Sequence, residues 1–149
     1  MPLAQTDDEL FDRIVAVNFR GVFNMLRLAA GRMREGGRII NLSTSVNRLA
    51  LPGYAVYAAT KSAVESMTAI FSKELRGREI TVNAVAPGPT ATDLFFEGKT
   101  EGQVEAMAKL PPLERLASPE DIAAVVAFLA GPDGSWINGQ TIRANGGMV

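Results

Sequence analysis

The chain contains no histidine and no cysteine among its 149 residues. Without these side chains it cannot build a Ser-His-Asp or Cys-His nucleophilic site, a zinc site based on His or Cys, a disulfide or a thiol redox centre. We therefore expect no metal site, and any chemistry must come from Tyr, Lys, Ser, Thr or the carboxylates.

An excess of charge of one sign is also missing. The formal net charge is -1, the pI is about 5.5, and no run of basic residues occurs. This balance gives no reason to expect a nucleic acid or an anionic membrane as a partner. No apolar stretch reaches the roughly 18 residues of a membrane span, and the first residues do not resemble a signal peptide. We expect a soluble, cytoplasmic protein.

No linker, repeat or low-complexity segment interrupts the sequence, so it fits one domain. Thr6 and Glu9 have the spacing of a capping box, which predicts a helix that begins there and runs to about residue 34. A second capping pattern at Ser118, with Pro119 at the first helical position, predicts the last main helix. Between them we expect helices at residues 57–75 and at about residues 103–109.

Three strands are predicted from short apolar, β-branched segments bounded by turn residues, at residues 38–43, 80–86 and 139–144. These strands alternate with the main helices along the chain. Because consecutive parallel strands are joined by right-handed crossovers, this order predicts an α/β fold with a parallel sheet covered by helices on both faces.

Tyr57 and Lys61 lie four residues apart in a predicted helix. Residues with this spacing lie one above the other on the same helix face, so the ammonium group of Lys61 can lie close to the hydroxyl of Tyr57. A nearby cation favours the phenolate over the phenol. The two residues are therefore a candidate proton-transfer pair.

Asn18 is a polar residue on the apolar face of the first predicted helix, four residues from both Ile14 and Val22. The other members of this face are Phe11, Val15, Phe23 and Leu26. In one interpretation, the amide of Asn18 points to the interior and caps a local backbone distortion or bonds a buried carbonyl. In the other, it positions a water or a lysine near an active site. The residues alone leave both interpretations open.

Five segments carry a resemblance to a known family. They are Val17-Asn18-Phe-Arg-Gly21, Gly37-Arg-Ile-Ile-Asn-Leu-Ser-Thr-Ser45, Tyr57-Ala-Ala-Thr-Lys61, Val82-Asn-Ala-Val-Ala-Pro-Gly88 with Thr92, and Gly139-Gln-Thr-Ile-Arg-Ala-Asn-Gly-Gly147. In order and spacing they resemble the classical short-chain dehydrogenases/reductases, above all the 3-oxoacyl-carrier-protein-reductase-like members. A lone Tyr-x-x-x-Lys pattern is a weak signal, whereas five segments in register over the whole chain are a specific one.

The resemblance implies an NAD(P)-dependent oxidoreductase that transfers a hydride between nicotinamide and a small carbonyl or alcohol substrate. Tyr57 would be the general acid that protonates the carbonyl oxygen, or the base in the reverse direction. Lys61 would stabilise the phenolate and hold the nicotinamide ribose. Asn18 would support the proton relay through a water.

The hydroxyl that polarises the substrate is normally a serine thirteen residues before the tyrosine in this family, and this position is Thr44 here. A threonine can donate the same hydrogen bond, although its methyl group crowds the substrate. Ser43 and Ser45 flank Thr44, and a small shift of the loop would put Ser45 in its place. The three hydroxyls stay open as alternatives.

Pro87, Gly88, Thr90 and Thr92 match the family segment that meets the nicotinamide carboxamide and the pyrophosphate. For Pro87 and Gly88 taken alone, the alternative to a cofactor-binding segment is an ordinary turn after a strand.

Leu94, Phe95 and Phe96 follow directly, where the family has a mobile segment that covers the substrate. They form either an apolar substrate wall or part of the core. Tyr54 either faces the same pocket or packs against its neighbours.

Four elements of the family have no counterpart in these residues: a first strand, the glycine-rich turn after it, a second strand with the residue that distinguishes NAD from NADP, and an Asn-Asn-Ala-Gly strand. The resemblance therefore implies that residues 1–149 are the C-terminal catalytic portion of a single Rossmann-type domain. That portion would be a partial doubly wound parallel sheet, made of the last three strands with their covering helices. The choice between NADP and NAD stays open, and we expect the chain alone to bind either very weakly.

A three-stranded portion of such a sheet would leave a bare edge and uncovered apolar helix faces, which are costly in water. We therefore expect a homo-oligomer, or completion by a missing N-terminal half. The alternative function is that of a truncated, non-catalytic remnant or an oligomerising interaction module, in which Tyr57 and Lys61 are vestigial. Whether the chain is an enzyme by itself stays open at this point.

Overall fold

The computed structural model describes residues 1–149 and has a three-stranded parallel sheet at its centre. The strands are β1 (Arg38–Leu42), β2 (Thr81–Pro87) and β3 (Thr141–Ala144), in the order β1-β2-β3. The first six residues of β2 are buried, as expected for a central strand covered on both faces. The predicted strands and their parallel order are confirmed.

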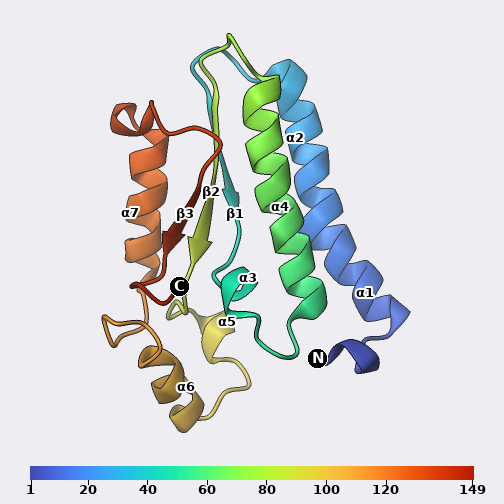
Figure 1. The fold of residues 1–149 in the computed structure, drawn as a ribbon, viewed down its shortest axis with the longest axis vertical. Helices are drawn as coiled ribbons and strands as arrows, with labels where there is room; N and C mark the ends of the chain where they lie inside the picture. The colour runs from blue at the N-terminus through green and yellow to red at the C-terminus, as the bar shows by residue number, and fades with distance from the viewer.

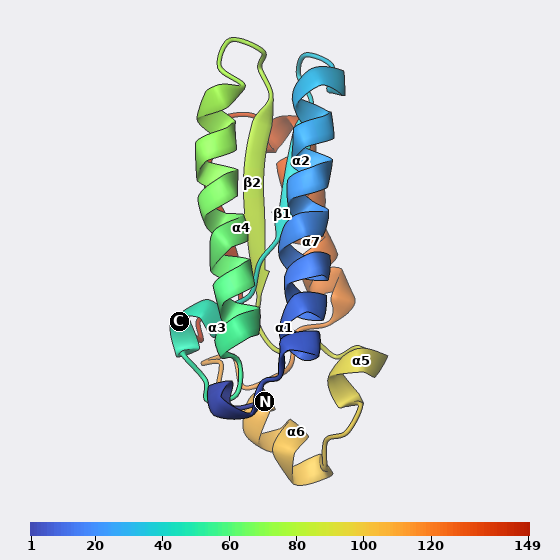
Figure 2. The same ribbon diagram turned by 90° about the vertical axis from the view of Figure 1, so that its right-hand side faces the viewer.

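Helices cover both faces of this sheet (Figures 1 and 2). The helices α1 (Asp8–Val15), α2 (Gly21–Arg32) and α4 (Ala55–Glu74) lie on one face, and α7 (Pro119–Ala130) lies on the other. The start of α7 has the predicted capping box at Ser118. The fold is therefore α/β with a partial Rossmann-like sheet, as the sequence predicts.

The start of the first helix differs from the prediction. Asp7 is the N-cap, because its side chain accepts a hydrogen bond of 2.8 Å from the backbone N–H of Leu10. Thr6 follows a 3₁₀ turn, and its hydroxyl donates to the carbonyl of Pro2 instead. The predicted capping box at Thr6 is thus wrong, because a local turn uses its hydroxyl and the helix begins one residue later.

The first helix also has a distortion in its middle, which the sequence does not reveal. Residues Ala16–Arg20 form a π-helical turn, in which the N–H of Gly21 bonds to the carbonyl of Ala16, five residues back. Asn18 lies inside this turn. The helix ends at Arg32, two residues before the predicted end.

Three short helices lie beyond the carboxyl ends of the strands (Figure 1). They are α3 (Val46–Leu49), α5 (Asp93–Phe96) and α6 (Glu101–Ala108). Of these three, the sequence predicts only α6. The structure shows a capping box at its start, with Thr100 as the N-cap. In parallel α/β sheets, ligands bind outside the carboxyl ends of the strands. The short helices therefore surround the expected position of a site.

The main apolar cluster lies between the sheet and the helices of one face. Its buried members are Leu26, Phe71, Leu75, Ile80 and Val82.

The first helix contributes less to this core than its pattern predicts, since Phe11 and Phe23 remain 47% and 45% exposed. No helix combines the length and the apolar character needed to cross a membrane.

Candidate active site

Tyr57 and Lys61 lie on the first turns of α4, which begins two residues before the predicted start. The ammonium nitrogen of Lys61 is 5.9 Å from the centre of the Tyr57 ring. The ring of Tyr54 packs edge-on against Tyr57, with 6.3 Å between the ring centres. The helical spacing thus places the ammonium group near the phenol ring, and the ring of Tyr54 also packs against it.

Lys61 is half-buried, and its Nζ donates a hydrogen bond of 3.0 Å to the carbonyl oxygen of Leu42 at the end of β1. Burial lowers the pKa of Lys61 below its ordinary value, because desolvation disfavours the charged ammonium. An ammonium group has three N–H donors, so two remain for another acceptor.

Three consecutive hydroxyls follow β1, and the structure gives each a different set of partners. Ser43 donates a hydrogen bond of 2.5 Å to a carboxylate oxygen of Glu65 on α4. Ser45 donates to the carbonyl of Ala86 at 3.1 Å, and it accepts a bond of 3.0 Å from the amide of Asn145. Both side chains are therefore committed to contacts within the protein.

Thr44 is different, although it is also buried. Its Oγ1 accepts a hydrogen bond of 3.3 Å from the backbone N–H of Val46, and its own O–H proton has no acceptor in the protein. Of the three alternatives that the sequence leaves open, Thr44 is the one whose proton is free for a ligand.

Glu65 connects the loop of these hydroxyls with the helix that carries the catalytic candidates. Besides the bond from Ser43, its Oε1 accepts a hydrogen bond of 2.9 Å from the side-chain amide of Asn47. Asn47 also donates to the Ser43 hydroxyl at 3.3 Å. Glu65 lies one turn beyond Lys61 and two turns beyond Tyr57, so all three side chains lie on one side of α4.

The segment after β2 is held by backbone and hydroxyl contacts. A Cβ at Gly88 would lie only 2.9 Å from the Cα of Asn145, so close packing against the residue that follows β3 requires glycine there. Thr90 donates to the carbonyl of Gly88 at 3.0 Å. Thr92 is the N-cap of α5 and accepts from the N–H of Phe95 at 3.1 Å.

A cavity of ≈ 390 Å³ brings most of the predicted site residues together. It is lined by Thr44, Tyr57, Pro87, Gly88, Thr90 and Thr92, together with Ser45 and Tyr54. Leu94 and Phe95 also line it, whereas Phe96 is 44% exposed and lies outside it. The cavity has the size of a site for a small organic ligand, for which volumes of about 300–1,000 Å³ are usual.

Two predicted residues do not line this cavity, namely Lys61 and Asn18. Lys61 lies beside Tyr57 as described. Asn18 is half-buried in the π-helical turn, which packs against α4, and its side chain makes no hydrogen bond within the protein. Single π-helical turns are frequent at functional sites. The backbone distortion expected in one interpretation of Asn18 is present, but its side chain does not cap it.

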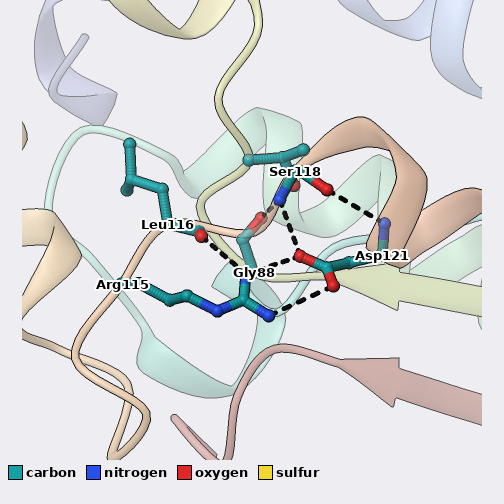
Figure 3. Close-up of polar contacts among 6 residues, drawn as sticks. Gly88, Arg115, Leu116, Ser118 and Asp121 are labelled. Carbon is teal, nitrogen blue, oxygen red and sulfur yellow. Dashed lines mark hydrogen bonds and ion pairs between the residues drawn. The ribbon is translucent and has the colours of Figure 1, made fainter.

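An ion pair joins the loop before α7 to the first turn of that helix (Figure 3). The guanidinium group of Arg115 binds both carboxylate oxygens of Asp121, at 2.6 and 3.1 Å. The Ser118 N–H also donates to this carboxylate, at 2.8 Å. The hydrogen bond from Arg115, and then the one from Ser118, lower the pKa of Asp121 to about 2.

This ion pair supports the segment after β2 indirectly. Ala117, between the two partners in the sequence, exchanges backbone hydrogen bonds with Pro89 and Ala91. Arg115, Asp121 and Gly88 line one small hollow of ≈ 260 Å³.

Comparison with known proteins identifies the family. A family model described as enoyl-(acyl carrier protein) reductase matches residues 1–149. A short-chain type dehydrogenase/reductase from Picea abies is 54% identical over 149 residues. The chain belongs to the short-chain dehydrogenase/reductase family.

Further members of the short-chain dehydrogenase/reductase family agree with this assignment. An NADPH-dependent aldehyde reductase-like protein of Arabidopsis thaliana, described as chloroplastic, is 48% identical over 149 residues. The crystal structure of the angucycline C-6 ketoreductase LanV with bound NADP superposes with a TM-score of 0.92 at 40% identity, over 99% of this chain and 57% of that one. In the alignment with each of the two curated relatives, 99% of this chain matches 55% of the length of the relative. The chain therefore spans little more than half the length of these short-chain dehydrogenases/reductases.

Four residues around the site are missed by the sequence reasoning: Asn47, Glu65, Lys99 and Asn145. Glu65 continues the helical spacing of Tyr57 and Lys61, so its position on the same helix face was a usable signal. Asn47 lies in the short helix α3, and Lys99 and Asn145 lie in loops; Asn145 contacts Ser45, a hundred positions earlier in the sequence. Nothing in their local pattern indicates them.

We predict that replacing Arg115 with Met raises the pKa of Asp121 from about 2 towards its ordinary value. The rise should be incomplete, because the Ser118 N–H still donates to the carboxylate. A pH titration of the side-chain ¹³C carboxyl signal measures this pKa. Because the folded-state pKa is lowered, the stability from this pair is present above the unfolded pKa and is lost as the pH falls towards about 2.

Arg143→Met is the matched control, since Arg143 lines the same hollow but makes no bond to Asp121. An unchanged titration midpoint of Asp121 in the Arg115 variant would show that the ion pair is not the main cause of its lowered pKa.

Proposed function

We propose that these residues form the substrate-binding and proton-transfer part of an NADP(H)-dependent carbonyl reductase, working with Tyr57 as general acid. The observation that carries the proposal is the single cavity that contains the Tyr57 ring and the free hydroxyl of Thr44. In this account residues 1–149 are the C-terminal catalytic portion of one Rossmann-type domain. NADP is favoured because relatives are described as NADPH-dependent or were solved with NADP or NADPH.

The proton chemistry rests on three side chains. A substrate carbonyl in the cavity accepts hydrogen bonds from the hydroxyls of Tyr57 and Thr44, which polarise it. When a hydride reaches the carbonyl carbon, the Tyr57 O–H bond breaks and its proton goes to the carbonyl oxygen, so an alcohol forms. The tyrosine is left as a phenolate, which the adjacent ammonium group of Lys61 stabilises.

The donor set around the cavity fits a nicotinamide nucleotide. When bound, this cofactor would supply the hydride. Lys61 has two free N–H donors for ribose hydroxyls. Pro87, Gly88, Thr90 and Thr92 would face the nicotinamide, and the hydroxyl proton of Thr92 is free because its oxygen acts as the helix cap.

Asn18 would bind a water of the relay from the π-helical turn. The glycine-rich turn that binds the pyrophosphate in the family has no counterpart in these residues.

The test is a chimera in which residues 1–149 replace the matching 55% of the Picea abies relative. We expect it to reduce aldehydes with NADPH, and we expect Tyr57→Phe to lower kcat by about 10²- to 10⁴-fold, the usual contribution of a general acid. NADPH binding, followed by fluorescence, should survive in this variant. The 149-residue chain by itself should show no saturation at micromolar NADPH, because phosphate contacts supply much of the affinity.

Tyr54→Phe is the matched control, since it removes a hydroxyl from the neighbouring ring on the same cavity. Activity near that of the parent chimera is expected for it. Full activity of the Tyr57 variant would contradict the proposed mechanism.

A second candidate function, an oligomerising module, is favoured by an apolar groove between α2 and α4. This groove of ≈ 350 Å³ is lined by Phe23, Leu26, Arg27, Ala30, Met67, Ile70, Phe71 and Glu74. Ile70 is 55% exposed there. A second copy related by a two-fold axis would cover the same patch and bring Arg27 of one chain towards Glu74 of the other. We therefore propose a homodimer through this groove.

We expect sedimentation velocity at micromolar concentration to show the dimer for the parent chain and a monomer for Ile70→Glu, because a carboxylate in the groove would be buried without a partner. Trp136→Glu is the control. It changes the most exposed large apolar side chain, at 97%, in the turn after α7. A stable parent monomer, or a monomer produced only by the Trp136 change, would contradict this interface.

A further inference from the structure

The cavity that contains Tyr57 has one charged residue in its wall, Lys99. The lining consists of seventeen residues, and the other sixteen are apolar or neutral polar. The apolar side chains next to Lys99 include Leu94, Phe95 and Met107. A single cation in such a wall creates a local preference for negative charge, because nothing else in the lining balances it.

Lys99 is half-buried, and its ammonium group has no charged partner in direct contact. It donates one hydrogen bond to the backbone carbonyl of Phe95 and lies 4.7 Å from the centre of the Phe95 ring. The two ion pairs of the structure join Lys109 with Glu105 and Arg115 with Asp121, so Lys99 makes no direct ion pair. Glu101 and Glu105 line a separate hollow on the other side of Lys99 and do not line the cavity of Tyr57. With one of its three N–H donors used, two can reach a ligand.

The position of Lys99 can also be explained without a ligand. It follows α5 and contacts a carbonyl in the last turn of that helix, where a positive charge is favourable. That explanation accounts for the one bond to Phe95. It does not require the side chain to line the same cavity as Tyr57 and Thr44, which it does.

We propose that Lys99 is an anion subsite of the cavity and selects substrates with an apolar body and a carboxylate or another anionic group. The substrate carbonyl would lie at Tyr57 and Thr44, the apolar body against Leu94 and Phe95, and the anionic group at Lys99. The placement of the carbonyl rests on the proposed reductase function. The anion subsite does not, because it depends only on the cavity and its single cation.

The methionines of this chain provide a direct readout of binding. Met107 and Met148 line the cavity, whereas Met1, Met25, Met33 and Met67 do not. In the chain with ¹³C-labelled methionine methyl groups, titration with 2-naphthoate should shift the first two signals and leave the other four in place. Its neutral counterpart 2-naphthamide has the same apolar body. We expect 2-naphthoate to bind about two- to fivefold more tightly, the value of one partly exposed charge pair.

Two variants separate an anion subsite from a structural role. Lys99→Met should abolish the preference for 2-naphthoate over 2-naphthamide, and Lys99→Arg should keep it. The four methionine signals outside the cavity show in each variant whether the fold is unchanged.

An equal affinity for the two probes in the parent chain, a preference that persists in Lys99→Met, or no shift of Met107 and Met148 with either probe would overturn the proposal. Because these titrations need neither cofactor nor turnover, their outcome is independent of the Tyr57 test.

Discussion

The carboxylate of Glu65 holds the candidate site together. It is half-buried on α4 and accepts hydrogen bonds from Ser43 and Asn47, which lie on either side of Thr44 in the loop after β1. Hydrogen bonds to a charged group contribute about 1.5–3 kcal/mol each, more than bonds between neutral groups. Through them, the helix that carries Tyr57 and Lys61 is fixed to the loop that carries the polarising hydroxyl. Two elements that the sheet alone would leave independent thus become one unit.

The other side of this loop is fixed to the sheet. Ser45 donates to the carbonyl of Ala86 in β2 and accepts from Asn145, just after β3. Thr44 therefore lies between a serine bound to α4 and a serine bound to the strands. Its neighbours use their hydroxyls for structure, and this leaves Thr44 with an O–H proton free for a ligand. A buried loop with satisfied flanking groups positions its remaining polar group accurately, as electrostatic catalysis requires.

The sequence predicts the elements with regular periodicity and misses what depends on tertiary contacts. The three strands, α4 and α7 follow from their apolar patterns and caps, and the resemblance carried by five segments in register, Tyr57 and Lys61 among them, indicates the family. The Thr6 cap fails because a preceding 3₁₀ turn uses its hydroxyl. The partners of Ser43 and Ser45, which leave Thr44 as the free hydroxyl, lie far along the chain, and no local pattern specifies them. No local pattern indicates the π-helical turn at Asn18 either. Lys99 resembles a surface lysine in sequence, and only the cavity distinguishes it.

A double-mutant cycle between Ser43→Ala and Glu65→Ala tests most directly whether this contact joins the loop to α4. Urea unfolding of the parent chain, both single variants and the double variant gives the coupling free energy. We expect about 1–2 kcal/mol, within the range for residues in one hydrogen-bonded network. The same cycle between Ser43→Ala and Glu74→Ala, an exposed carboxylate at the far end of α4, should give a value near zero. A Ser43–Glu65 coupling below about 0.3 kcal/mol would contradict the account, because distant and independent sites give values of that size.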